Sequence, residues 1–274
     1  MDEQITKFKK HLEKAELSGK TIDSYMWTLG YFFSNYEKLN KENILAYKGY
    51  LSGSFQPQTV NLRLQAINKY LEFIDNPRLK VKFVKVQQKS FLENVISLAD
   101  YDFLKTSLKK DNNDDWYFVV WFLGATGARI SEFVKIKANH VKQGHLDLYT
   151  KGGKNRRIYI PKKLREEAIK WIQKREAKDK IPVGYLFVNR FGKRITERGV
   201  AQQLKHFARK YEIDDKLVYP HSFRHMYGKN FIEKFKDIAL LADLMGHESI
   251  ETTRIYLRRT ATEQQDIVDK IITW

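Results

Sequence analysis

A lysine-rich stretch about a third of the way along the chain divides it into two parts that we expect to fold separately. Residues 75–77 read Asp-Asn-Pro and end a helical pattern, and residues 78–89 then place lysines between apolar residues. This alternation favours an extended linker whose charges can follow a phosphate backbone, with a plain edge strand as the alternative. We therefore predict a first domain over 1–85, a linker to about 90, and a second domain over 91–274.

The first part of the chain carries apolar residues at helical spacing. Four runs of residues within 1–75 show this spacing, and the clearest is the apolar stripe from Val60 to Ile74. This stripe follows Pro57, a residue suited to the first turn of a helix. Thr21 and Asn40 can cap the second and third helices. The pattern predicts a compact all-α unit of four helices. Four polar residues of the last helix lie off its apolar stripe and could face DNA: Thr59, Asn61, Arg63 and Lys69.

The second part combines helical patterns with one β-hairpin. Residues 145–150 alternate, a glycine-containing turn follows, and alternation resumes at 157–160. Lys151 thus lies where a strand enters the turn, and 186–188 reads as another short strand. We therefore predict a mainly α fold with a small β-sheet, with an all-α first domain and an α+β second domain. Further helices are predicted over 100–110, 114–124, 162–178, 196–211 and 237–245.

The charge of the chain points to a polyanionic partner. The chain contains 50 Lys and Arg residues and 33 Asp and Glu residues, which gives a net charge of +17. Residues 1–86 hold 14 basic and 9 acidic residues, or +5, which leaves +12 for the remainder. Because both parts are basic, nucleic acid is the favoured partner, with an anionic membrane surface or simple solubility as alternatives.

Several other classes of protein are excluded by composition. The chain has no cysteine, so disulfides and cysteine-based zinc sites are excluded. No apolar run approaches the ~20 residues of a membrane-spanning helix. The first residues lack the apolar core of a secretion signal, and a cytoplasmic protein is the simplest interpretation.

Basic side chains and one tyrosine gather near the end of the chain in a pattern that suits phosphate chemistry. His221 and Arg224 lie one turn apart on a predicted helix, and His247 directly follows another helix that ends in glycine. Tyr256 lies on a short predicted helix over 250–258. Guanidinium groups match phosphate oxygens in a planar, bidentate manner.

A tyrosine can attack such a phosphate as a covalent nucleophile. Its reference pKa of about 10 leaves roughly one phenol in a thousand ionised at neutral pH, a handicap of about 4 kcal/mol that nearby cations or a base must offset. A leaving alkoxide also needs a proton, which a lysine or histidine can donate. No cluster of carboxylates or histidines in the sequence suggests a metal.

The order of these residues along the chain resembles that of the tyrosine recombinase (phage integrase) family. The matching segments are Thr126-Gly-Ala-Arg-Ile-Ser-Glu132, Lys151-Gly-Gly, His221-Ser-Phe-Arg-His225, and Leu244-Met-Gly-His-Glu-Ser-Ile-Glu-Thr-Thr-Arg-Ile-Tyr256. The resemblance covers about 91–262 by motif, and 1–75 is similar to the helical core-binding domain of the family. Phe223 and Met245 stand where the family more often has leucine, at packing positions.

The resemblance implies a two-domain enzyme that clamps double-stranded DNA, with a four-helix, SAM-like core-binding domain and a catalytic domain. Arg129 and Arg224 would hold the scissile phosphate. His221 would act as acid, base or phosphate contact, and His247 would support the transition state. Glu132 also matches the family pattern, in a structural role.

The resemblance further implies a covalent mechanism without metal, ATP or any other cofactor. Tyr256 would attack the phosphate and form a 3′-phosphotyrosyl bond. Lys151, on the hairpin, would protonate the departing 5′ oxygen. His225 matches the family pattern as a structural residue. Integration and excision of a mobile element is the favoured outcome, because Phe223 and Met245 are more typical of element-borne integrases, with DNA inversion or chromosome-dimer resolution as alternatives.

The end of the chain suggests self-association. Ile267, Ile271 and Trp274 share one face of a predicted tail helix over 263–274. By resemblance, this tail would dock on a neighbouring protomer in a synaptic tetramer on DNA, whereas packing on its own domain is the alternative. An accessory directionality factor would be a further partner.

Three other functions are compatible with these features. A non-catalytic DNA-binding regulator with the same fold would bind DNA without a covalent adduct. An enzyme similar to type IB topoisomerases would use similar chemistry without strand exchange. A basic protein that binds RNA or a membrane is a weaker interpretation.

Overall fold

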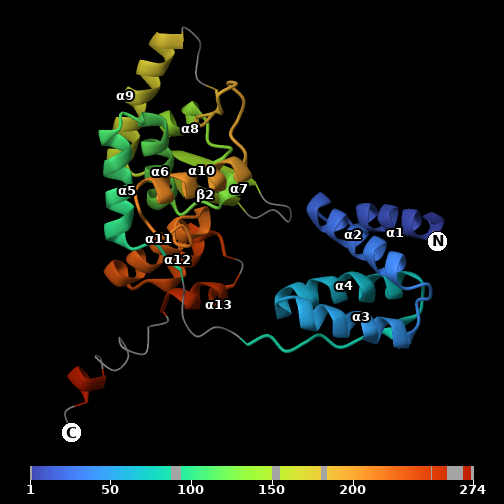
Figure 1. Cartoon of the computed structure of the whole chain (residues 1–274). Helices are drawn as coiled ribbons and strands as arrows, with labels where there is room; N and C mark the ends of the chain where they lie inside the picture. Colours follow the sequence, from blue (N-terminus) through green and yellow to red (C-terminus); the bar gives the residue numbers. More distant parts are fainter. Residues whose placement is uncertain are drawn as a thin grey trace. The chain divides into compact units, whose positions relative to one another are not determined.

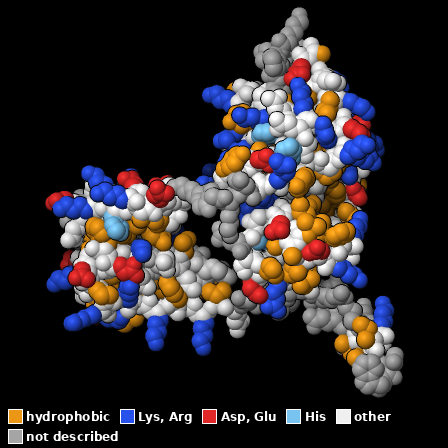
Figure 2. All heavy atoms as spheres, turned by 180° about the vertical axis from the view of Figure 1, so that it is seen from behind, with side chains coloured by type: hydrophobic (Ala, Val, Ile, Leu, Met, Phe, Trp, Pro, Cys, Tyr) orange, Lys and Arg blue, Asp and Glu red, His pale blue; other side chains and the backbone are white. Residues whose placement is uncertain are grey.

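The computed structural model describes residues 2–87, 94–149, 155–179, 184–247, 249–257 and 268–272. The chain divides into two compact units, Met1–Gln88 and Lys89–Trp274. Lysine and arginine side chains project from the surface of both (Figure 2). Among the described residues, no helix has the length and apolarity needed to cross a membrane.

Within residues 2–87, the regular elements of the first unit are helices (Figure 1). Its buried core includes Phe8, Leu29, Phe32, Tyr47 and Leu64, contributed by all four long helices. The elements are α1 (Asp2–Lys14), α2 (Gly19–Asn35), α3 (Lys41–Ser54), α4 (Pro57–Phe73) and the 3₁₀ turn η1 (Pro77–Leu79).

Local signals account for most of these helix starts. Pro57 is the first residue of α4, and the side chain of Asn40 accepts a hydrogen bond from Asn43 N at 2.8 Å at the start of α3, as predicted. The predicted cap at Thr21 is wrong. Ser18 caps α2 instead, because its Oγ accepts from the backbone N–H of Thr21 at 3.2 Å.

The segment after η1 is held against α4 by two asparagine side chains. Asn68 accepts from Val81 N at 3.0 Å and donates to Val81 O at 2.9 Å. Asn61 makes the same pair of hydrogen bonds with Val84, at 2.8 Å and 3.0 Å. The amides thus replace the ladder partner that an extended segment lacks. The segment forms no strand, and Asn61 binds the linker rather than facing outward.

Other residues of α4 that were expected to face DNA also have partners within this unit. Arg63 donates to Thr28 Oγ1 at 3.0 Å and stacks over the Trp27 ring at 4.1 Å. Lys69 pairs with Glu72 at 3.0 Å.

The second unit packs its helices around a separate apolar core. Buried aromatic residues of this core include Phe118, Phe122, Phe133 and Phe207. The elements are α5 (Leu98–Lys110), α6 (Asp114–Thr126), α7 (Ile130–Phe133), α8 (Ala138–Gln143), β1 (His145–Tyr149), β2 (Asn155–Tyr159), α9 (Lys162–Asp179), α10 (Glu197–Lys210), α11 (Pro220–Phe235), α12 (Ile238–Met245), α13 (Ile250–Thr253) and the 3₁₀ turn η2 (Arg254–Leu257).

The predicted hairpin is confirmed. Strands β1 and β2 pair antiparallel, with Asp147 opposite Arg157, and these side chains form an ion pair of 2.7 Å. The predicted strand over 186–188 is wrong. Tyr185, just before this segment, forms an isolated bridge with Lys137, and Val188 forms another with Arg194, so the pairing is split between two partners and no strand forms.

The last helices form a small cluster of their own. Ile232, Leu241, Met245 and Tyr256 are buried together there. The predicted helix over 250–258 is interrupted, because α13 ends at Thr253 and a 3₁₀ turn carries Tyr256. Of the predicted tail helix, only 268–272 lies within the described residues; Ile267 and Trp274 lie outside them.

Candidate active site

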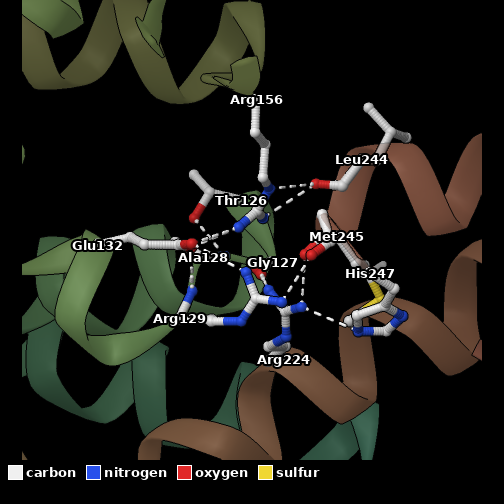
Figure 3. Close-up of polar contacts among 11 residues, drawn as sticks. Thr126, Gly127, Ala128, Arg129, Glu132, Arg156, Arg224, Leu244, Met245 and His247 are labelled. Carbon is white, nitrogen blue, oxygen red and sulfur yellow. Dashed lines mark hydrogen bonds and ion pairs between the residues drawn. The ribbon is translucent and has the colours of Figure 1, made fainter. Parts of the chain in front are cut away.

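Three arginines from three parts of the chain meet the last turn of α12 (Figure 3). The last carbonyl groups of a helix lack partners within the helix and carry partial negative charge. Here they stabilise three cations that would otherwise repel one another. Three consecutive carbonyl oxygens each accept from a different guanidinium: Leu244 from Arg156 at 3.0 Å, Met245 from Arg224 at 2.6 Å, and Gly246 from Arg129 at 2.7 Å.

Arg129 is the most accessible of the three. It lies directly before α7, with extended backbone angles. The side chain is 37% exposed, against 6% for Arg156. Its contacts to Glu132 and Gly246 use two of the five N–H donors of the guanidinium. Donors therefore remain for an anion that approaches from solvent.

Glu132 connects Arg129 to Arg156. Its carboxylate accepts from Arg129 N at 2.7 Å and Nη1 at 3.0 Å, and both of its oxygens accept from Arg156 Nη1 at 2.6 Å. Burial raises the pKa of Glu132, but the two arginines outweigh burial and hold that pKa below its ordinary value. The carboxylate is therefore ionised at neutral pH.

Arg224 is buried and held from two sides. It donates to Gly127 O at 2.6 Å and to Met245 O at 2.6 Å, and its Nη2 lies 3.0 Å from His247 Nε2. Burial and the neighbouring Arg129 lower the pKa of Arg224 to about 10, so the guanidinium stays charged at neutral pH. Its position is fixed before any ligand arrives.

The contacts of His247 determine its tautomer. A guanidinium can only donate, so Nε2 of His247 accepts from Arg224. The proton is then on Nδ1, which donates to Thr253 Oγ1 at 2.7 Å. Burial and the charge of Arg224 lower the pKa of His247 to about 4, which makes the ring neutral at pH 7.

Tyr256 is buried beside this group. It is 5% exposed, and its ring lies almost parallel to that of His247, with centroids 6.3 Å apart. A Cβ atom on Gly228 would lie 2.8 Å from the ring, so glycine gives it room on α11. Burial raises the pKa of Tyr256 to about 12, although Arg224 and Arg129 oppose this rise.

The remaining predicted residues are placed less completely. His221 is an exposed residue of α11, although part of its ring is desolvated. This desolvation and the charges of Arg224 and Arg129 lower the pKa of His221, so it lies within electrostatic reach of both arginines. Lys151 lies outside the described residues. In the described part of the chain, no group of three or more His, Cys, Asp or Glu side chains could hold a metal ion.

Two residues of the site, Arg156 and Thr253, were not predicted from the sequence. Arg156 shares the buried face of β2 with Ile158, a placement that strand alternation would have revealed. Because a buried arginine needs a charged or polar partner, its predicted burial would have indicated a role in the site. Thr253, which orients His247, carried no comparable signal.

Comparisons with known proteins agree with the motif resemblance. The phage integrase family model matches residues 99–263. The chain is 28% identical to tyrosine recombinase XerA of Pyrococcus furiosus, over 98% of this chain and 93% of that protein. It is 27% identical to the TnP I resolvase of Bacillus thuringiensis, over 91% and 93% of the two chains.

Solved structures show the same fold. The Tn1549 transposon integrase in complex with transposon right end DNA has a TM-score of 0.72 and 13% identity, over 98% of this chain and 99% of that one. The XerH recombinase bound to difH has a TM-score of 0.68 and 16% identity, over 90% and 78% of the two chains. Because the family model spans more than half of the chain, this protein belongs to the phage integrase family of tyrosine recombinases, enzymes that cleave and rejoin DNA.

Proposed function

We propose that Arg129 and Arg224 bind the scissile phosphate of a specific DNA site and that Tyr256 attacks it. The observation that carries this proposal is the gathering of the two guanidinium groups, His247 and Tyr256 around the end of α12. Both arginines keep unused N–H donors, and charge-assisted contacts to phosphate oxygens are strong. The cations would also stabilise negative charge that develops in the transition state.

The proposed reaction conserves the phosphodiester bond. The phenol oxygen of Tyr256 forms a bond to phosphorus, and the bond from phosphorus to the 5′ oxygen breaks. Tyr256 loses its proton, and the departing oxygen gains one, for which Lys151 is the proposed donor. Attack by a free 5′ hydroxyl on the 3′-phosphotyrosyl bond then reverses these steps and rejoins DNA. The exposed His221 would contact a phosphate oxygen. The neutral His247, which accepts from Arg224, would support the transition state by holding that guanidinium in place.

Domain roles follow as part of the same proposal. Met1–Gln88 would act as the core-binding domain and Lys89–Trp274 as the catalytic domain, both on double-stranded DNA. The basic side chains on the surface of both units support this assignment. Since the proposed substrate is cellular DNA, the protein would act in the cytoplasm.

The experiment that tests the nucleophile is covalent trapping. Tagged protein is incubated with fragmented DNA of the organism that encodes it, captured after denaturation, and the attached DNA is sequenced to map the site. A nicked duplex with that site should then give a denaturant-resistant adduct. Tyr256→Phe should give none while it still binds the duplex. An adduct with Tyr256→Phe would refute the assignment, and a wild-type protein that binds the site without any adduct would be a regulator.

The outcome of recombination has two candidates. Integration and excision of a mobile element is the first, supported by Phe223 and Met245 and by the fold shared with a transposon integrase. Resolution is the second, supported by the similarity to a resolvase over most of both chains. Reporter plasmids with two sites in cis, and pairs of plasmids with one site each, distinguish them. A dependence of excision on a second protein would reveal a directionality factor.

We also propose that the tail mediates assembly of a synaptic tetramer. Within 268–272, three apolar side chains are exposed: Val268 at 50%, Ile271 at 60% and Ile272 at 46%. Exposed apolar groups on one short segment are suited to docking on a neighbouring protomer. Deletion of 263–274 should weaken synapsis in gel-shift experiments and spare binding to a single site. Unchanged synapsis would refute the role of the tail.

A further inference from the structure

Arg156 is the third arginine at the end of α12, and the proposed chemistry gives it no role. It lies on β2, on the same face as the buried Ile158, and its side chain is only 6% exposed. Desolvation of a guanidinium is costly unless strong partners replace water. Its partners therefore indicate what the arginine does.

Each edge of the Arg156 guanidinium binds a different element. Nη1 donates to both oxygens of Glu132 at 2.6 Å, beside the start of α7. Nε and Nη2 donate to Leu244 O at 3.2 Å and 3.0 Å, at the end of α12. The planar group thus fixes the spacing between these two elements, which a single-point cation such as lysine cannot do.

The aliphatic part of Arg156 also fits against the turn that precedes His247. A Cβ atom on Gly246 would lie 2.2 Å from Cδ of Arg156, and Gly246 has a φ of +61°, which favours glycine. The carbonyl of Gly246 accepts from Arg129. Arg156 therefore contacts, on one side, the residue whose carbonyl orients Arg129.

The second route from Arg156 to Arg129 passes through Glu132. That carboxylate accepts from both the backbone and the side chain of Arg129. Its place is set in turn by Arg156. All three nitrogens of the Arg156 guanidinium already donate to Glu132 or to Leu244 O, so we do not assign it to the phosphate.

We propose that Arg156 is a positioning residue of the recombinase: it holds Glu132 and the end of α12 so that Arg129 presents its free donors to the scissile phosphate. The inference rests on the proposed function, because it assigns Arg129 to that phosphate. A shift of Arg129 by about 1 Å would slow cleavage on the order of 100-fold.

The state of Glu132 provides a signature that a general loss of stability would not. Glu132 faces Arg129 on its own segment, Arg156 on β2 and Arg224 on α11, and Tyr227 lies near Arg156. Without Arg156, burial of the carboxyl is opposed by fewer cations, so its pKa rises. The cleavage rate of Arg156→Met should therefore fall at mildly acidic pH, where the wild-type rate is maintained. Arg156→Met with Glu132→Gln should lack this additional fall.

The matched control lies next to Arg156 on the same strand. Arg157 points to the opposite face, is 47% exposed and pairs with Asp147. Arg157→Met removes the same charge without touching the end of α12. Three quantities are measured for each variant on the mapped nicked duplex: the single-turnover rate of adduct formation, the Kd for a single site, and the Tm.

We expect Arg156→Met to form adduct about 30- to 100-fold more slowly than Arg157→Met, with a Kd within about threefold. Equal rates, or a loss explained by weaker DNA binding, would overturn the inference. If the methionine variant does not fold, Arg156→Lys carries the test: it can pair with Glu132 but cannot bind Leu244 O at the same time, and should be about 10-fold slow. A wild-type rate for this variant would also overturn it. A wild-type protein that forms no adduct would instead contradict the proposed function.

Discussion

The hydroxyl of Tyr256 lies 3.1 Å from Nδ1 of His225. Burial, together with His221 and Arg224, lowers the pKa of His225 to about 4, whereas that of Tyr256 is about 12. Both side chains are therefore neutral at pH 7, and one hydrogen bond joins the phenol to the imidazole. Because the pKa of the phenol lies far above that of the imidazole, transfer of the proton from Tyr256 to His225 is strongly unfavourable. His225 in this arrangement orients the phenol and does not act as its base.

The first prediction concerns this hydrogen bond. His225→Phe leaves the buried hydroxyl of Tyr256 without its hydrogen-bond partner, which should lower the free energy of unfolding by about 1–2 kcal/mol. Adduct formation should slow about 10-fold, because the nucleophile loses its orientation. Urea unfolding and single-turnover cleavage measure the two effects.

A double-mutant cycle isolates the interaction between the two side chains. Tyr256→Phe and His225→Phe should show a coupling free energy of about 1 kcal/mol, because the second substitution removes a bond that the first has already broken. Strict additivity would mean that the contact contributes nothing to stability.

The second prediction concerns acid. His225 and His247 have pKa values of about 4 in the folded protein, below the 6.5 of an ordinary histidine. Between these pH values the two histidines are protonated in the unfolded chain but not in the folded protein. The free energy of unfolding therefore decreases as the pH falls from about 6.5 towards 4. We expect about 1–2 kcal/mol for each histidine, roughly half of the full linkage value because solvent reaches part of both rings.

Thermal unfolding between pH 7 and 4.5 measures this loss. A variant that combines His225→Gln and His247→Gln should show a shallower fall of Tm with acid. His11→Gln, at an exposed position of α1, should keep the wild-type slope. Equal slopes in all three proteins would contradict the assignment of the loss to the buried rings.

The fold could be predicted largely where the signals are local. Pro57 and Asn40 act on backbone groups within three residues, so their helices begin where the sequence places them. Ser18 and Thr21 show the limit of such reasoning, because both residue types are good caps and the structure places Ser18 at the cap. The strand prediction for 186–188 was wrong for a different reason. Tyr185 and Val188 bridge to two separate segments, and such pairing cannot be read from the local sequence.

The residues that carry the proposed chemistry could be predicted from the sequence, but the groups that hold them in place could not. Arg129, Arg224 and Tyr256 are side chains with recognisable chemistry at a recognisable order. The groups that arrange the guanidiniums are mostly backbone carbonyls, at Gly127 and over 244–246, and a carbonyl has no signature in a sequence. The structure was needed to find that one helix end serves three arginines.

The third prediction uses the glycine beneath Tyr256. Gly228 lies within α11, and alanine in a helix interior usually stabilises by about 0.5–1 kcal/mol relative to glycine. At Gly228 the new methyl group would lie 2.8 Å from the Tyr256 ring, so the ring must move. We expect Gly228→Ala to destabilise by about 1–3 kcal/mol and to slow adduct formation at least about 10-fold, with unchanged DNA affinity.

Gly30→Ala is the matched control for this substitution. Gly30 also lies within a helix, α2, but a Cβ atom there would meet nothing within 4 Å. It should stabilise the protein and leave cleavage unchanged. If Gly228→Ala cleaves as fast as Gly30→Ala, the position of Tyr256 tolerates the displacement, and its packing on α11 is not needed for attack.

The last prediction concerns the two asparagines that hold the linker. Val81 N donates to Asn68 Oδ1, and no regular secondary structure protects the segment from 80 to 87. Asn68→Ala removes the acceptor, so the Val81 amide should exchange with solvent about 10-fold faster, the effect of losing roughly 1.4 kcal/mol. Gln65→Ala, at an exposed position of the same helix, should leave this exchange unchanged. Because the hydrogen bonds between Asn61 and Val84 remain, exchange at the Val84 amide should change much less than exchange at Val81. Equal acceleration at both amides would mean that the segment opens as one unit.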